Sequence, residues 1–363
     1  MKVLLAGGGT GGHLMPMLAL ADALETLRSD LEPVLVGAER GIEAELLPRR
    51  GRHRYHLVAV EPFHRRAWWR NARWFWRARG VMRQCYGILE RENPTFAVGT
   101  GGYAAGPMLL ACRRRGIPVA LQEQNAYPGI TTRLLARSAA QIHLGFPEAK
   151  AHLRPGDHTE IFAFGNPITP PPDHPDRGSA RSALGIEAEA MVCFVVGGSQ
   201  GARSINRALS AALDAGALDG VTVLWSTGKG TWTEFERHHA PPGIQVKPFW
   251  DPVSAAYGAA DLVIGRAGVL TTAELSAWGL PAILIPLPSA AADHQTKNAL
   301  ALVHAGSALH VPESALDPSG LAHHIKQLLS SPERLADMAR KATERSHPEA
   351  ATRIAEQLLR LAD

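Results

Sequence analysis

Glycine-rich segments stand at three points of the chain where a phosphate-bearing ligand could bind. They are residues 7–12 (GGGTGG), 197–201 (GGSQG) and 265–271 (GRAGVLT). Glycine turns after strands let main-chain N–H groups approach a phosphate, and the N-terminus of the following helix favours negative charge. The pattern differs from the dinucleotide fingerprint, because Val36 leads into Gly37 and Ala38 rather than into an acidic residue that would hold a ribose.

Polar residues in the second half of the chain suit a nucleotide that carries a sugar. The N–H groups of Val269 to Thr271 are expected at a helix N-terminus, which suits a diphosphate. Glu274, near the end of the first helical turn, could accept hydrogen bonds from both ribose hydroxyls, or it could be the capping-box partner of Thr271. Residues 288–298 (PSAAADHQTKN) follow a strand and suit hydrogen bonding to sugar hydroxyls.

The elements that must position these residues form two similar series. Residues 1–6 and 191–196 are short apolar strands, each followed by a glycine turn and a helical pattern, over about 15–27 and up to about 215. Further strands are expected at 33–36, 96–98, 119–122 and 141–144, and at 222–226, 245–247, 262–264 and 282–285. Alternation of strands with helices indicates parallel sheets. The proline-rich residues 165–173 are interpreted as an interdomain linker.

Composition indicates a protein with sizeable cores and no membrane span. The chain has 363 residues, a net charge of +4 and 45% hydrophobic residues, so two domains are expected. Its three cysteines are far apart, without metal-ligand spacing, as in a reduced cytoplasmic protein. The N-terminal apolar run is too short for a signal peptide, and no run of 18 apolar residues occurs. A cytoplasmic location is expected.

A basic, aromatic stretch at residues 64–79 contains four of the eight tryptophans and six arginines. Tryptophan and arginine together suit the interface of an anionic membrane. The alternative is a helix that buries its tryptophans in the domain core. Trp68 and Trp69 are adjacent and cannot easily lie on the same buried face of a helix, which favours the membrane interpretation. Nucleic-acid binding is supported by no other motif. The residues expected at the membrane are Trp68, Trp69, Arg70, Arg73, Trp74, Phe75, Trp76 and Arg77.

Seven motifs, taken in order, resemble those of the MurG glycosyltransferases. They are GGGTGGHLMP (7–16), GTGGYAAGP (99–107), EQNAYPG (123–129), GNP (165–167), VVGGSQGA (195–202), RAGVLTTAEL (266–275) and DHQTKNA (293–299). The resemblance spans essentially the whole chain. It implies a GT-B fold, that is, two Rossmann-like doubly wound parallel-sheet domains facing a cleft. Residues 1–165 would bind the acceptor and the membrane, 166–344 would bind UDP-GlcNAc, and a helix at about 345–363 would pack back on the first domain.

The resemblance implies site residues by position. The donor would contact Thr10, Gly11, Gly12, Asn125, Ser199, Trp250, Val269, Leu270, Thr271, Thr272, Glu274, His294 and Gln295. The acceptor would contact Gly9, His13, Gly101, Gly102 and Tyr103. His13 and Glu274 are the catalytic candidates. The chain departs from the family at Thr169, where some members have arginine, and at Ala267, where serine is common.

The implied reaction moves GlcNAc from UDP-GlcNAc to undecaprenyl-pyrophosphoryl-MurNAc-pentapeptide, converting lipid I to lipid II in peptidoglycan synthesis at the cytoplasmic face of the membrane. The acceptor hydroxyl would attack the anomeric carbon with inversion. His13 would either take its proton or bind the acceptor pyrophosphate. Without a D-x-D motif, neither a metal nor a tightly bound cofactor is expected. The alternatives are a UDP-GlcNAc 2-epimerase, a transferase for another lipid, and a protein that only senses UDP-sugars.

Overall fold

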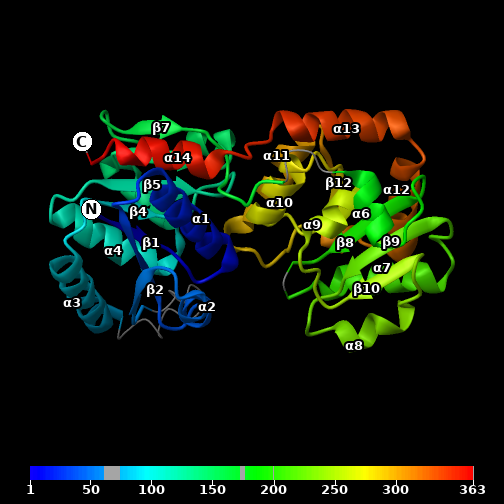
Figure 1. Cartoon of the computed structure of the whole chain (residues 1–363), viewed down its shortest axis with the longest axis horizontal. Helices are drawn as coiled ribbons and strands as arrows, with labels where there is room; N and C mark the ends of the chain where they lie inside the picture. Colours follow the sequence, from blue (N-terminus) through cyan, green and yellow to red (C-terminus); the bar gives the residue numbers. More distant parts are fainter. Residues whose placement is uncertain (61–73, 172–175, 199, 363) are drawn as a thin grey trace. The chain divides into compact units, whose positions relative to one another are not determined.

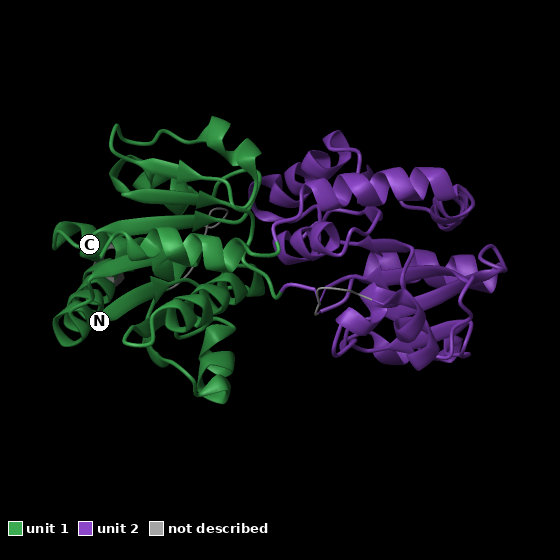
Figure 2. Cartoon of the chain, turned by 45° about the horizontal axis from the view of Figure 1, so that its top comes forward, with its two compact units in different colours: residues 1–169, 348–363 green, residues 170–347 purple. Residues whose placement is uncertain are grey.

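The protein forms two compact units. The structure, a computed structural model, describes residues 1–60, 74–171, 176–198 and 200–362, with residues 74–77 as backbone only. Unit 1 comprises Met1–Thr169 and Pro348–Asp363, and unit 2 comprises Pro170–His347 (Figure 2). The chain therefore passes between the units twice, after Thr169 and again after His347.

Unit 1 is built on a parallel sheet of seven strands in the order β3-β2-β1-β4-β5-β6-β7 (Figure 1). The strands are β1 (Lys2–Ala6), β2 (Glu32–Ala38), β3 (Arg54–Val58), β4 (Phe96–Gly99), β5 (Val119–Glu123), β6 (Gln141–Leu144) and β7 (Glu160–Phe162). The helices are α1 (Gly11–Leu27), α2 (Glu43–Arg50), α3 (Trp74–Glu92), α4 (Gly102–Arg114), α5 (Ile130–Leu135) and α14 (Ala350–Leu359). The strand order reverses between β1 and β4, which is where doubly wound domains bind ligands.

Helices cover both faces of this sheet because its strands are apolar on both sides. In β1, Leu4 packs with the core that includes α3 and α4, whereas Val3 and Leu5 pack with the core that includes α1. The helix α14 completes this second core with Ile354, Ala355 and Leu358, and lies beside α1 in Figure 1. Such two-sided burial is typical of parallel sheets.

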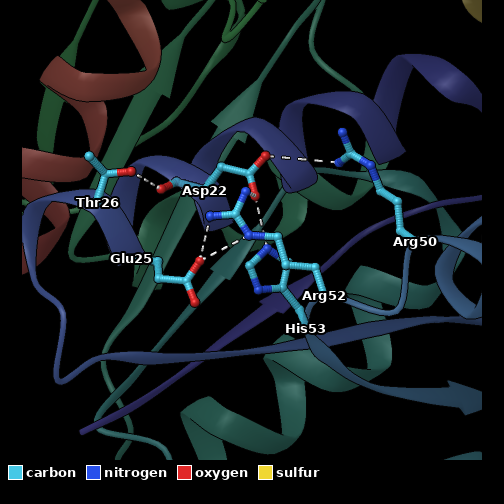
Figure 3. A network of polar contacts seen from close by, with 6 residues as sticks. All are labelled: Asp22, Glu25, Thr26, Arg50, Arg52 and His53. Atoms are coloured by element: carbon cyan, nitrogen blue, oxygen red, sulfur yellow. Dashed lines mark hydrogen bonds and ion pairs between the residues drawn. The ribbon is translucent and has the colours of Figure 1, made fainter.

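A polar network ties α1 to the segment that joins α2 to β3 (Figure 3). Arg52 lies 2.7 Å from the carboxylate of Glu25 and 3.2 Å from that of Asp22. The imidazole of His53 lies 2.9 Å from Asp22, and Arg50 approaches the same carboxylate at 3.9 Å. Several charges share two carboxylates here, so the contacts fix the approach to β3 more than any single exposed pair would.

Unit 2 has a parallel sheet of six strands in the order β10-β9-β8-β11-β12-β13. The strands are β8 (Met191–Val196), β9 (Val221–Ser226), β10 (Ile244–Lys247), β11 (Leu262–Gly265), β12 (Ala282–Leu284) and β13 (Ala308–His310). The helices are α6 (Arg177–Ala183), α7 (Arg203–Asp214), α8 (Trp232–Phe235), α9 (Ser254–Ala259), α10 (Val269–Ala277), α11 (His294–His304), α12 (Pro318–Leu329) and α13 (Pro332–Glu344). Its strand order reverses between β8 and β11.

The predicted fold class is confirmed in both units, each of which is a doubly wound parallel sheet. All the strands predicted from the sequence are present within a residue or two. Three edge strands, β3, β7 and β13, were not predicted. Two of these segments have only three residues, and the third, RYHLV, mixes polar and apolar side chains, so no apolar run marks them.

Candidate active site

The first glycine turn, between β1 and α1, is closed around a buried carboxylate. Gly8 and Gly9 have φ of +129° and +88°, values that favour glycine. The Gly9 N–H donates to both carboxylate oxygens of Glu43, at 2.9 and 2.8 Å, and the Ala38 N–H donates to one of them at 2.8 Å. Glu43 is fully buried. Gly9 is one of the residues expected at the acceptor, and its N–H is already bonded within the protein.

The second glycine turn, after β4, packs directly on the first. Gly101 and Gly102 also have positive φ, and a Cβ on Gly102 would lie 2.0 Å from the Gly8 carbonyl oxygen. A Cβ on Gly9 would lie 2.6 Å from the Tyr103 ring. Burial and the nearby charge of Glu43 raise the pKa of Tyr103, which favours its neutral phenol. Four of the predicted acceptor residues therefore form one compact surface with the start of α1.

His13 lies in the first turn of α1 and faces Gly101. A Cβ on Gly101 would stand 2.8 Å from His13 Nδ1, so the turn must be glycine for the ring to lie there. The Thr100 hydroxyl donates to the His13 carbonyl at 2.9 Å, and Nδ1 is 3.0 Å from Gln124 Oε1. Thr10 is exposed at the N-cap of α1, without a side-chain cap bond, and Gly11 and Gly12 follow it. The structure therefore groups His13 with the amides of Gly11 and Gly12, which have no acceptor among the described residues.

Asn125 follows β5 in a loop held by a second buried carboxylate. The main-chain and side-chain N–H groups of Asn125 lie 3.0 and 3.2 Å from Glu123 Oε1. The Gly129 N–H and the Thr132 hydroxyl donate to Glu123 Oε2 at 2.9 and 2.6 Å. Glu123 thus shapes the loop that presents Asn125.

In unit 2, the N-terminus of α10 presents amides that have no partner among the described residues, beside an acidic side chain. Gly268 is the N-cap, so the N–H groups of Val269, Leu270 and Thr271 have no intrahelical acceptor. Thr272 differs from the expectation: its N–H donates to the Gly268 carbonyl, and its hydroxyl, which is buried, donates to the carbonyls of Gly268 and Val269. The N–H and hydroxyl of Thr272 are therefore already bonded within the helix, unlike the amides of Val269, Leu270 and Thr271.

Glu274 is bonded to Tyr257 and not to Thr271. The Tyr257 hydroxyl, on α9, donates to Glu274 Oε2 at 2.9 Å. This excludes the capping-box alternative, since the N-cap is Gly268. Burial raises the pKa of Glu274, and the bond from Tyr257 opposes that rise. One carboxylate oxygen remains without a bond to the described residues, so it could accept one from a ligand.

Trp250 precedes α9 with its ring buried and its main chain available. The Lys247 ammonium lies 3.9 Å from the centre of the indole, and Phe194 packs edge-on against it at 6.1 Å. Its main-chain N–H and C=O make no hydrogen bond to the residues that the structure describes. This suits a main-chain contact with a planar base better than a contact through the ring.

The polar cluster before α11 has two consecutive residues in left-handed conformation, Ala292 at φ +52° and Asp293 at φ +55°. This conformation is uncommon outside glycine and costs about 1–2 kcal/mol per residue. His294 Nδ1 bonds the Ala291 carbonyl at 2.7 Å, and Gln295 Oε1 accepts from the Leu287 N–H at 2.9 Å. The amide nitrogen of Gln295 is thereby left for a ligand, whereas His294 is used to shape the loop.

Several expected residues lie outside the described part of the chain. They are Ser199 and, of the membrane set, Trp68, Trp69, Arg70 and Arg73; Trp74, Phe75, Trp76 and Arg77 are described only as helical backbone of α3. Conversely, sequence reasoning missed Glu43, Gln124 and Tyr257. Gln124 stands inside the motif EQNAYPG and could have been found there, whereas nothing in the sequence marked the other two. Within the described residues, no cluster of three or more His, Cys, Asp or Glu side chains could hold a metal ion.

Comparisons with known proteins agree along the whole chain. The model of the glycosyltransferase family 28 N-terminal domain matches residues 3–144, and that of the C-terminal domain matches residues 192–354. A relative from Salinibacter ruber, named UDP-N-acetylglucosamine--N-acetylmuramyl-(pentapeptide) pyrophosphoryl-undecaprenol N-acetylglucosamine transferase, is 40% identical over 99% of this chain and 97% of its own. The crystal structure of Acinetobacter baumannii MurG superposes with a TM-score of 0.79, at 27% identity over 99% of each chain. A UDP-GlcNAc 2-epimerase from Neisseria meningitidis, 15% identical over 99% of this chain and 100% of its own, shares the fold with a TM-score of 0.69.

Proposed function

The chain belongs to glycosyltransferase family 28 and, within it, to the MurG family, and on this premise we propose how its residues perform the transfer. The chain is a transferase that moves N-acetylglucosamine from UDP-GlcNAc to N-acetylmuramyl-(pentapeptide) pyrophosphoryl-undecaprenol, a step of peptidoglycan synthesis. The observation that carries this activity is the full-length likeness to a transferase of that name, at 40% identity. The likeness to the epimerase, at 15% identity, extends to the fold alone.

Unit 2 binds the nucleotide in this proposal. The amides of Val269, Leu270 and Thr271 hold the diphosphate, because an α-helix N-terminus favours negative charge and offers unpaired donors. Glu274 accepts hydrogen bonds from the ribose hydroxyls, Trp250 meets the uracil through its main chain, and the Gln295 amide nitrogen donates to the GlcNAc. The same helix N-terminus stabilises the UDP that leaves.

Unit 1 supplies the base. His13 accepts the proton of the MurNAc hydroxyl through Nε2 as this hydroxyl attacks the anomeric carbon and the bond to UDP breaks, with inversion. Nε2 makes no bond to the described residues, and the paired glycine turns leave the ring room beside Gly101. Asn125, in its loop on Glu123, contributes to the sugar side of the donor. Replacing His13 by alanine is expected to lower kcat by about 10²-fold or more.

Association with an anionic membrane surface rests on α3 and its neighbour α4. A groove of about 720 Å³ lies along α3, beginning at the last two residues of the basic, aromatic stretch. Arginines and apolar side chains share it, a combination that suits lipid phosphates and the interface below them. No helix among the described residues is long and apolar enough to cross a bilayer. The groove is lined by Ala78, Arg79, Met82, Arg83, Tyr86, Gly87, Glu90 and Arg114.

The transfer assay uses labelled UDP-GlcNAc and a short-chain analogue of the lipid acceptor. We expect labelled disaccharide lipid from the natural chain and at least a tenfold loss of kcat/KM with Glu274→Ala. The control is Glu333→Ala, an exposed carboxylate on α13, which should behave as the natural chain does. Epimerised sugar without acceptor would contradict the proposed function. Equal activity of Glu274→Ala and Glu333→Ala would contradict the placement of the donor site.

The membrane proposal is tested by cosedimentation with vesicles of phosphatidylglycerol or of phosphatidylcholine. Replacing Arg79, Arg83 and Arg114 by glutamine should reduce binding to the anionic vesicles by about 1 kcal/mol per arginine. The control removes three positive charges from α13, at Arg334, Arg340 and Lys341. If both triple variants lose binding equally, net charge and not this groove accounts for the association.

A further inference from the structure

Three buried amide side chains form a hydrogen-bonded series from His13 to the point where the chain first leaves unit 1. Gln122 and Gln124 come from β5 and from the residue after it, and Asn166 comes from the GNP motif. Gln124 Oε1 lies 3.0 Å from His13 Nδ1, and Gln124 Nε2 donates to Gln122 Oε1. Gln122 Nε2 in turn donates to Asn166 Oδ1 at 3.2 Å. All three amides are at most 4% exposed, so water does not compete for these bonds.

Main-chain carbonyls fix the orientation of Gln124, because a carbonyl oxygen can only accept. Gln124 Nε2 lies 2.7 Å from the Thr100 carbonyl oxygen and 3.1 Å from that of Gln122. A flipped amide would bring its own oxygen against these two oxygens and leave them unpaired. The amide nitrogen must therefore face the carbonyls, and the amide oxygen must face His13.

A further main-chain carbonyl, at the Asn166 end of the series, orients the amide groups in the same way. Asn166 Nδ2 donates to the main-chain carbonyl of Gln124 at 2.9 Å, which turns Asn166 Oδ1 toward Gln122. Gln122 then presents its own oxygen to Gln124 Nε2. The carbonyl contacts of Gln124 and of Asn166 are independent, and each alone would orient the three amides in the way observed.

We propose that Gln124 is a positioning residue that holds neutral His13 with its hydrogen on Nδ1, and so keeps Nε2 as the proton acceptor. The inference rests on the proposed role of His13 as base. An amide oxygen accepts a hydrogen bond only from a ring nitrogen that carries hydrogen, and the bond at one nitrogen sets the state of the other. Unlike a carboxylate, the amide adds no negative charge that would favour the protonated ring. The neighbouring carboxylate, Glu123, is bonded into the Asn125 loop instead.

The test is ¹⁵N nuclear magnetic resonance of the histidine side chains in the full chain. The His13 signals among the 16 histidines are assigned by their loss in His13→Asn. We expect hydrogen on Nδ1 in the natural protein and a mixed or reversed tautomer in Gln124→Leu. The same variant should lose about 10²-fold in kcat with KM for UDP-GlcNAc unchanged, since a misplaced hydrogen removes only the base.

A matched control distinguishes loss of the positioning role of Gln124 from a general loss of stability. Gln141→Leu removes another buried glutamine of unit 1 that bonds a different histidine, His143, and it should alter neither the His13 tautomer nor kcat. Hydrogen on His13 Nε2 in the natural protein would overturn the inference without any variant, even if Gln124→Leu fails to fold. An unchanged tautomer in folded Gln124→Leu would overturn it as well. Absence of transfer by the natural chain would instead refute the proposed function, and the spectrum would still decide the tautomer.

Discussion

Replacing Tyr257 by phenylalanine is expected to weaken UDP-GlcNAc binding through Glu274. The change removes one hydroxyl and keeps the ring, which packs against Phe194 at 5.6 Å and Trp278 at 6.0 Å. The lost bond, 2.9 Å long, is made to a carboxylate, and such bonds contribute about 1.5–3 kcal/mol. In the proposed donor site, part of this energy holds the carboxylate in place for the ribose. We therefore expect a dissociation constant about tenfold higher, equivalent to about 1.4 kcal/mol.

The pH dependence of this loss has a defined sign. Burial raises the pKa of Glu274 and the Tyr257 bond lowers it, so Tyr257→Phe raises the pKa further. More of the carboxyl is then protonated as the pH falls, and the variant should lose more affinity at pH 6 than at pH 8. Calorimetric titration with UDP at both pH values measures this, with KM for UDP-GlcNAc as the kinetic counterpart.

A double-mutant cycle decides whether Tyr257 acts through the carboxylate. In a Glu274→Gln background, Tyr257→Phe should change the affinity by less than about threefold, because the neutral amide forms a weaker bond with the phenol. A tenfold loss that persists in this background would refute the reasoning and assign the effect of Tyr257 to packing. The melting temperature of each variant shows whether unit 2 remains folded.

Three further outcomes are expected. Burial lowers the pKa of His143 to about 3, so between that value and the unfolded pKa of about 6.5 only the unfolded chain takes up the proton. The free energy of unfolding therefore decreases as the pH is lowered. In urea unfolding, the natural protein should lose about 2 kcal/mol more than His143→Phe between pH 7 and pH 5. Glu43→Gln should lower the stability of unit 1 by about 3 kcal/mol, because an amide group would face N–H donors, whereas Glu45→Gln on the exposed side of α2 should cost under about 1 kcal/mol. Ellman's reagent should leave the native thiols unreacted and titrate all of them in urea, because burial raises the pKa of Cys85, Cys112 and Cys193.

The interior strands and the glycine turns could be predicted from the sequence because each depends on local properties. A run such as MVCFVV is apolar on both faces only in a buried parallel strand, and Gly8 and Gly9 take a backbone conformation that other residues rarely adopt. The same reasoning located the N-terminus of α10. The edge strands β3, β7 and β13 have no such signal, because they are very short or mix polar and apolar side chains.

The partners of the site residues could not be predicted because they depend on packing between distant segments. Glu43 reaches Gly9 across 34 residues, and Tyr257 reaches Glu274 across 17. In the sequence each is one acidic or aromatic residue among many. Gln124 is marked by its place in the motif EQNAYPG, but its role depends on the carbonyls that surround it in three dimensions.

The return of α14 to unit 1 has a consequence for how the protein is made. A ribosome produces the first 169 residues, then all of unit 2, and only then the helix whose Ile354, Ala355 and Leu358 complete the core beside α1. Nascent domains generally fold in the order of their synthesis. Here the earlier unit must keep an apolar groove on α1 uncovered while the later one is translated. Unit 1 therefore closes its core only after α14 has been made, later than the residues of unit 2.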